Sequence, residues 1–201
     1  MSRAIEILMG EHRLIEQVLE SLETYVVGIE QGLPPERPTL GEYAAFFRGF
    51  ADACHHGKEE DLLFQRMLER GFPRERGPLA VMFHEHELGR ARVAALRGLG
   101  EADGPLGSVE VQLVVENSSA FIELLRAHIL KEDGILYPMA ERLLTGHELD
   151  ALKTDFERLE KAMRADGSFD RFHGLAGALS SRFRPDPGRM AEAARPLSCH
   201  A

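Results

Sequence analysis

The stretch HHGKEEDLLF, residues 55–64, places metal-ligand side chains directly beside an apolar run. A nearly identical phrase, HILKEDGILYP, occupies residues 128–138. In each phrase a histidine and a glutamate are four residues apart, His55 with Glu59 and His128 with Glu132. Residues four apart lie on one face of a helix, one turn from each other. The spacing therefore predicts two helices that each carry a His/Glu pair able to bind a metal ion.

A further histidine precedes each phrase at the same distance. His12 lies 43 residues before His55, and His86 lies 42 residues before His128. In a bundle whose helices alternate in direction, these side chains can converge on one point in the core. Four imidazoles and two carboxylates suit two metal ions, and this donor set favours iron, manganese or zinc. Six protein groups for two ions also leave positions open for a small molecule.

Helical periodicity runs through nearly the whole chain. Apolar residues recur at three- and four-residue spacing over 2–31, about 41–70, about 79–98 and 109–145. Segments rich in Gly and Pro separate these runs, and no segment shows strand alternation with hairpin turns. Four long helices with short connections predict an all-α fold, an antiparallel up-down-up-down four-helix bundle.

The C-terminal quarter differs from the bundle in its pattern. Two shorter amphipathic helices, 147–163 and 168–183, are expected to pack on the outside or at one end of the bundle. The Pro- and Arg-rich residues that follow are typical of a flexible tail. We therefore expect a bundle over 1–145, an extension with two additional C-terminal helices over 146–184, and a tail over 185–201.

Composition excludes several partners. The 201 residues carry a formal net charge of −9, whereas a nucleic-acid binder would carry a basic stripe. No apolar run approaches the length of about 20 residues that a membrane span needs, and the N-terminus shows no secretory signal. We expect a cytoplasmic protein that binds neither nucleic acid nor membrane, while a protein partner stays open.

Two alternatives compete with a metal site. A single His/Glu pair on a helix is usually solvated, and a duplication preserved for packing could bury the same residues as hydrogen-bonded pairs. Two copies with matching upstream histidines favour a metal, because a solvated pair needs no repeat and burying such pairs without a metal is costly.

Other histidines at similar spacing could serve as the ligands instead. His56 and Glu60 are also four apart, and His84 lies two residues from His86. The repeat selects His55 with Glu59, because this register aligns Phe64 with Tyr137. We therefore expect His56 and His84 at the surface or flank of the site, and the remaining charges of the two phrases in solvent.

Three apolar or aromatic residues are expected near the site. Tyr137 matches Phe64 in the repeat, which favours core packing over a role in tuning the metal. Phe121 and Leu124 lie one heptad and one turn before His128, and we expect them to form a dry lining that controls gas access.

On these motifs, over about residues 8–140, the chain resembles the hemerythrin-like family, also called the HHE cation-binding family. The resemblance implies a four-helix bundle around a non-haem di-iron centre, with two iron ions joined by an oxo or hydroxo bridge. Glu59 and Glu132 would bridge the ions. Carried onto the matching positions, the implied metal ligands are His12, His55, Glu59, His86, His128 and Glu132.

One position departs from the oxygen-carrying members. Those proteins have a fifth histidine four residues along the third helix, whereas Met82 and Arg90 flank His86 here at that spacing. The chain resembles the members with four histidines and two glutamates, which disfavours a simple oxygen carrier.

The resemblance implies a protein that binds or reacts with oxygen, nitric oxide or peroxide, in sensing, storage or detoxification. One alternative is a di-iron oxidoreductase acting on peroxide, nitric oxide or iron. Others are a metal-dependent regulatory module read through 147–163 and 168–183, and a structural site for zinc. No acid, base or nucleophile stands out beyond the ligands, so enzymatic turnover stays open.

Overall fold

The computed structural model describes residues 1–185, which form helices and contain no strand. No helix in this range is long and apolar enough to cross a membrane. The elements in chain order are α1 (Arg3–Glu30), α2 (Arg37–Phe46), η1 (Phe47–His56), η2 (Glu59–Leu63), α3 (Phe64–Glu69), α4 (Pro78–Glu101), α5 (Ser108–Lys131), η3 (Glu132–Leu136), α6 (Tyr137–Leu143), α7 (Gly146–Ala165) and α8 (Ser168–Arg182).

All six predicted helical runs are present. The second run, α2 through α3, begins at Arg37 rather than near Gly41 as the sequence suggested. It includes Pro38 in its first turn, where proline is tolerated because the first helical N–H groups have no partner within the helix. The fourth run joins α5, η3 and α6 without a break.

Two of the long runs change geometry where the repeat predicts ligands. In η1, η2 and η3 the backbone widens into π-helix. The segment η2 begins at Glu59 and η3 begins at Glu132, so both repeats carry a π-turn at the same position. Short π-helical segments within α-helices are frequent at functional sites, because they change the direction of the side chains that follow.

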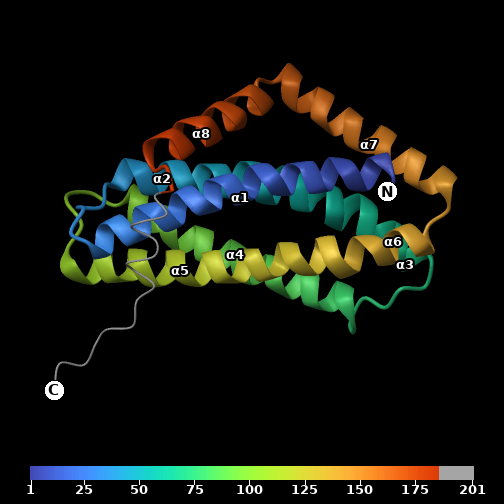
Figure 1. Cartoon of the computed structure of the whole chain (residues 1–201), viewed down its shortest axis with the longest axis horizontal. Coiled ribbons are helices and arrows are strands. Elements are labelled where there is room, and N and C mark those ends of the chain that lie inside the picture. The colour runs from blue at the N-terminus through green and yellow to red at the C-terminus, as the bar shows by residue number, and fades with distance from the viewer. Residues whose placement is uncertain (186–201) are drawn as a thin grey trace.

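The long helices lie side by side along the long axis of the molecule (Figure 1). Helix α4 packs against α2 and α5, and α1 packs against α5. Their buried apolar residues form two clusters, one containing Leu8 and Met67 and the other containing Ile15 and Phe121. On α1, His12 lies between the two clusters, in a polar layer that is closed off by apolar residues on both sides.

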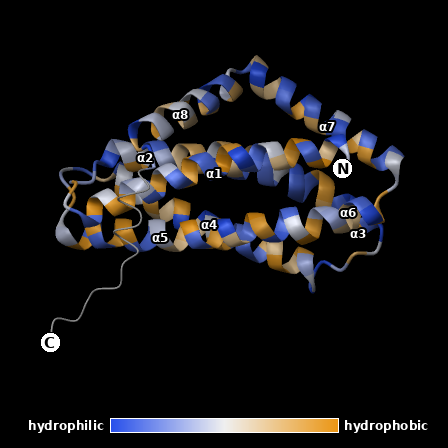
Figure 2. Cartoon of the chain, in the orientation of Figure 1, coloured by the Kyte–Doolittle hydropathy of each residue, from blue (hydrophilic) through white to orange (hydrophobic). Residues whose placement is uncertain are grey.

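Helices α7 and α8 lie along one side of the molecule, next to α1 (Figure 1). Figure 2 shows α7 as mostly hydrophilic, and its buried residues Leu152 and Phe156 join the cluster that contains Leu8. Phe172 and Leu179 of α8 join the other cluster. The predicted division into a bundle and an extension stays a prediction, and residues 186–201 of the predicted tail lie outside the described residues.

Candidate metal centre

The six predicted ligands converge in the polar layer between the two apolar clusters. They come from α1, η1, η2, α4, α5 and η3, so every long run contributes. Each of them is at most 2% exposed: His12, His55, Glu59, His86, His128 and Glu132.

Glu132 lies between two of the imidazoles. Its Oε2 is 3.2 Å from Nε2 of His12, and its Oε1 is 3.1 Å from Nε2 of His128. Its side chain therefore reaches one histidine from each repeat.

Glu59 lies in the matching position. Its Oε2 is 3.7 Å from Nε2 of His55 and 3.5 Å from Nε2 of His86. The Nε2 atoms of His86 and His128 are 3.0 Å apart. All four imidazoles thus direct Nε2 at the two carboxylates.

The outward-facing nitrogen of each imidazole meets another carboxylate. A carboxylate accepts hydrogen bonds, so Nδ1 carries the proton and leaves the Nε2 lone pair directed at the centre. This arrangement fixes the ring and raises its basicity in histidine metal sites. The pairs are His12 with Asp133 at 2.7 Å, His55 with Glu11 at 3.0 Å, His86 with Glu60 at 2.6 Å and His128 with Glu85 at 2.9 Å.

Basic side chains balance these carboxylates in turn. Lys58 donates to Glu11, and Lys131 donates to Glu85. Arg13 and Arg90 donate to Asp133 and Glu60, both at 2.6 Å. The expectation that the remaining charges of the two phrases face solvent was wrong for Lys58, which is buried, and for Glu60 and Asp133, which each hold an imidazole.

The repeat contained the signal that would have identified these residues. Glu11 matches Glu85, and Lys58 matches Lys131, at the same offsets from the ligands. Glu60 of the first repeat and Asp133 of the second also occupy matching positions. The match extends beyond the ligands to the groups that orient them.

Several inward-facing atoms have no hydrogen-bond partner among residues 1–185. They are Nε2 of His55, Oε2 of Glu59 and both carboxylate oxygens of Glu132. A buried polar group without a partner costs stability, and a buried charge costs more. A cation between these atoms would satisfy them, so the donor set fits a metal site.

The titration of the two central carboxylates reflects their crowding. Burial, together with the neighbouring Glu132, raises the pKa of Glu59 well above its usual value. Burial also opposes ionisation of Glu132, but His128 and His12 lower its pKa well below the usual value. Burial disfavours the charged form of His128 as well, yet Glu132 and Glu85 raise its pKa to about 9. In the metal-free protein, protons occupy positions that a cation would take.

Comparison with known families identifies this arrangement. A family model described as the hemerythrin HHE cation-binding domain matches residues 3–140. The chain belongs to the hemerythrin HHE cation-binding family. The match includes all six predicted ligands and the carboxylates that hold their Nδ1 atoms.

The relatives add no function to this assignment. Uncharacterized proteins of Mycobacterium bovis and of two Mycobacterium tuberculosis strains are each 20% identical to this chain over 166 residues. The alignment covers 83% of this chain and 64% of each relative, so the chain spans less than two thirds of their length. No solved structure matches the chain.

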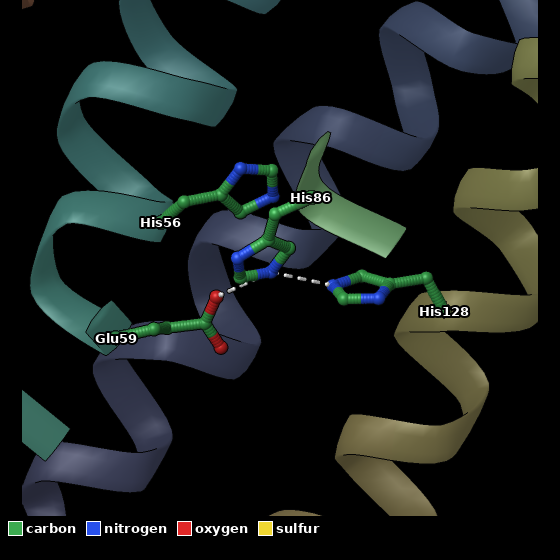
Figure 3. A group of neighbouring side chains, drawn as sticks. All are labelled: His56, Glu59, His86 and His128. Carbon is green, nitrogen blue, oxygen red and sulfur yellow. Dashed lines mark hydrogen bonds and ion pairs between the residues drawn. The ribbon is translucent and has the colours of Figure 1, made fainter. Parts of the chain in front are cut away.

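His56 was expected at the surface or flank of the HHE site, which consists of the six predicted ligands and the carboxylates that hold their Nδ1 atoms. The surface position was wrong, because the side chain is buried beside the ligands. It is 7% exposed, and its ring stacks on His86 with the centroids 3.8 Å apart (Figure 3). Adjacent residues diverge by a smaller angle in π-helix than in α-helix, which lets His55 and His56 of η1 both face inward. Burial lowers the pKa of His56 to about 3, so its imidazole is neutral. His84 is exposed, as predicted.

Tyr137 also adjoins the HHE site. Its hydroxyl donates to Oε1 of Glu59 at 2.7 Å and lies 3.3 Å from Nε2 of His12. The match to Phe64 had favoured core packing alone, but phenylalanine has no hydroxyl, and that difference was the available signal. The two repeats therefore surround the central carboxylates differently.

A cavity of about 250 Å³ adjoins the centre beside His86 and His128. Phe121 and Leu124 line it, as the sequence suggested. Gly89 lies in its wall at the position that Ile15 occupies in the first repeat, and the missing side chain leaves space on this side. The cavity thus reaches the half of the HHE site that belongs to the second repeat.

Proposed function

We propose that this chain is a di-iron protein that binds or reacts with oxygen, nitric oxide or peroxide. The observation that carries the proposal is the closed layer of four imidazoles and two carboxylates, with unpartnered oxygens and a nitrogen facing one another. Family membership supports cation binding at this place. Imidazole and carboxylate donors without a thiolate suit iron.

We also propose how the four long helical runs are arranged, from the lengths of their connections. The connections between the four long runs are short, and the runs lie side by side (Figure 1). Short connections between adjacent helices favour an antiparallel, up-down-up-down four-helix bundle.

The ligands divide into two sets around the central carboxylates. His12 and His55 would hold one ion, and His86 and His128 would hold the other. Glu59 and Glu132 lie between the two sets and would bridge the ions. When bound, the iron pair supplies electrons and an open position for a small molecule.

The protein's own residues supply orientation, access and exclusion of water. The carboxylates at Nδ1 hold each imidazole with its lone pair inward. The apolar clusters on both sides of the polar layer keep bulk water away, and the cavity beside His128 offers a route inward. The Tyr137 hydroxyl holds a proton at Oε1 of Glu59, within reach of the centre.

Metal content and optical absorption test the proposal. We expect about two irons per chain after expression with added iron, and a spectrum that changes when the reduced protein meets oxygen, nitric oxide or peroxide. The exposed His84→Ala variant should behave as the wild type, and a Glu59→Gln/Glu132→Gln double variant should lose iron. Finding zinc, or iron without any spectral response, would contradict the proposal.

The cavity favours a second candidate, a di-iron oxidoreductase that consumes peroxide. Its volume of about 250 Å³ leaves room for a peroxide molecule and for the water formed from it, since a water molecule occupies about 30 Å³ in the liquid. Sustained consumption of excess hydrogen peroxide would favour this enzyme. A single stoichiometric reaction, reversed on removing the ligand, would favour reversible binding.

A further inference from the structure

The cavity beside His86 and His128 is large enough for an organic molecule. Its volume is about 250 Å³. An apolar cavity of about 150 Å³ can hold a benzene molecule, so this space can hold an aromatic ring with a short side chain.

The cavity has apolar walls between two polar ends. His86 and His128, side by side in Figure 3, line its inner end, and Arg48 and Arg97 line it further out. Small-molecule sites have this composition, with a mostly apolar lining and a few polar groups that fix orientation. The apolar wall consists of Phe47, Ala51, Val93, Phe121, Leu124 and Leu125.

Two contacts place Arg48 and Arg97 together at the outer end. Near the centre the His56 ring stacks on His86, and further along a methyl group added to Gly100 would meet the backbone of α2. The run from α2 to η1 and helix α4 therefore pass each other in opposite directions. Arg48 precedes His56 and Arg97 follows His86, so both arginines lie away from the centre, Arg97 by about 16 Å along the helix axis.

The two acidic side chains in the wall are already neutralised. Asp52 accepts a hydrogen bond from Arg90 at 2.8 Å. Glu85 accepts from Lys131 and from Nδ1 of His128, the latter at 2.9 Å. Neither carboxylate is therefore left to attract a cationic ligand.

The two outer guanidinium groups are available for an anion. Arg48 is exposed and forms no ion pair within residues 1–185. Arg97 meets Glu101 at 3.8 Å in an exposed pair, and such pairs are weak. Arg97 also occupies the position that Glu23 holds in the first repeat, so a basic residue stands on the cavity side where the other half has an acid. A guanidinium binds a carboxylate through two parallel hydrogen bonds.

We propose that this cavity binds a small organic acid. Its carboxylate binds Arg48 and Arg97, and its apolar body packs against Phe121 and Leu124. This site goes beyond the proposed reaction and requires no particular metal. A bound acid would lie in the route by which small molecules reach the second metal position.

Calorimetric titration of the Zn²⁺-loaded protein with 3-phenylpropanoate tests the site. The uncharged 3-phenylpropanamide keeps the shape, and acetate keeps the charge without the ring. We expect the acid to bind, and the amide to bind about 10-fold or more weakly, because hydrogen bonds between charged groups are the stronger ones. Acetate should also bind about 10-fold or more weakly, because it buries no ring. A wild type that does not bind the acid at millimolar concentration, or that binds acetate or the amide equally well, overturns the proposal.

Arginine variants locate the carboxylate. Arg48→Met/Arg97→Met should weaken binding of the acid about 10-fold or more and leave binding of the amide unchanged. The control Arg92→Met/Arg158→Met removes the same charge from exposed positions outside the cavity and should leave both unchanged. Equal weakening in the control, or full binding of the acid in Arg48→Met/Arg97→Met, would place the carboxylate elsewhere, for example on the metal, and overturn the proposal.

Gly89→Leu tests the apolar part of the site. A Cβ atom at Gly89 makes an ordinary contact of 3.7 Å with Phe121, so the rest of a leucine side chain extends into the cavity. We expect it to weaken binding of the acid and of the amide together, with the Zn²⁺ content unchanged. Gly98→Leu on the same helix, where a Cβ atom meets nothing within 4 Å, is the control and should bind both normally. Normal binding of the acid in Gly89→Leu would show that the acid does not occupy this cavity.

Discussion

Lys58 and Lys131 occupy matching positions in the two repeats, but their surroundings differ. Each donates to the glutamate that holds a histidine, Glu11 for Lys58 and Glu85 for Lys131. The Lys58 side chain is 1% exposed, whereas that of Lys131 is 35% exposed. Removing one partner of a buried ion pair leaves a buried charge, while water can solvate a charge near the surface.

We therefore predict that Lys58→Met lowers the free energy of unfolding of the metal-free protein by about 3 kcal/mol. The matched variant Lys131→Met should lower it by less than about 1 kcal/mol. Urea unfolding measured by circular dichroism compares the two. Equal losses would show that burial does not distinguish the two lysines.

Metal binding is also expected to depend on pH, through the protons held by Glu59 and His128. In the metal-free protein burial and Glu132 raise the pKa of Glu59, and Glu132 and Glu85 overcome burial to raise that of His128 to about 9. A metal ion requires both groups deprotonated, so binding near neutral pH must release protons. Affinity should therefore rise as the pH increases from about 6 toward 9.

Calorimetric titration with Zn²⁺ in buffers of different ionisation enthalpy counts the released protons. The His84→Ala variant should release the same number as the wild type, because His84 lies outside the site. Affinity that does not change with pH would contradict the raised pKa values of Glu59 and His128.

At the scale of the element, the helices were predictable because apolar periodicity and the Gly/Pro-rich segments are local features. The His/Glu spacing also placed the ligands on one helical face. The π-turns at Glu59 and Glu132 were not predictable in this way, because α- and π-helix share the same residue preferences and tertiary contacts decide between them. The burial of His56 depends on that geometry, and the expected surface position was wrong for this reason.

Gly49 shows how the extension depends on one residue of η1. A methyl group at Gly49 would overlap the ring of Phe172 in α8. We predict that Gly49→Ala costs about 1–3 kcal/mol through overpacking, with loss of hydrogen-exchange protection centred on α8. Gly41→Ala in α2, where a methyl group meets nothing within 4 Å, should be neutral or stabilising. Unchanged protection of α8 in Gly49→Ala would contradict this packing.

At the scale of the whole molecule, the polar layer separates the two apolar clusters and carries unpartnered carboxylate oxygens. Metal binding should therefore be linked to folding. We predict that a divalent cation at about 1,000 times its dissociation constant stabilises the protein by about 4 kcal/mol. Thermal unfolding with and without a chelator measures this shift. The Glu59→Gln/Glu132→Gln double variant should show no shift, and an equal shift in it would place the cation elsewhere.

The carboxylates that hold the imidazoles cross between the repeats. Glu60 of the first repeat holds His86 of the second, and Asp133 of the second holds His12 of the first. A helical hairpin cut from either half would lack the acceptor for its leading histidine, and two identical copies related by a twofold axis would restore it. Such a homodimer could offer only two equivalent metal positions. Joining the halves in one chain allows them to diverge, and Tyr137 opposite Phe64 gives each metal position its own environment.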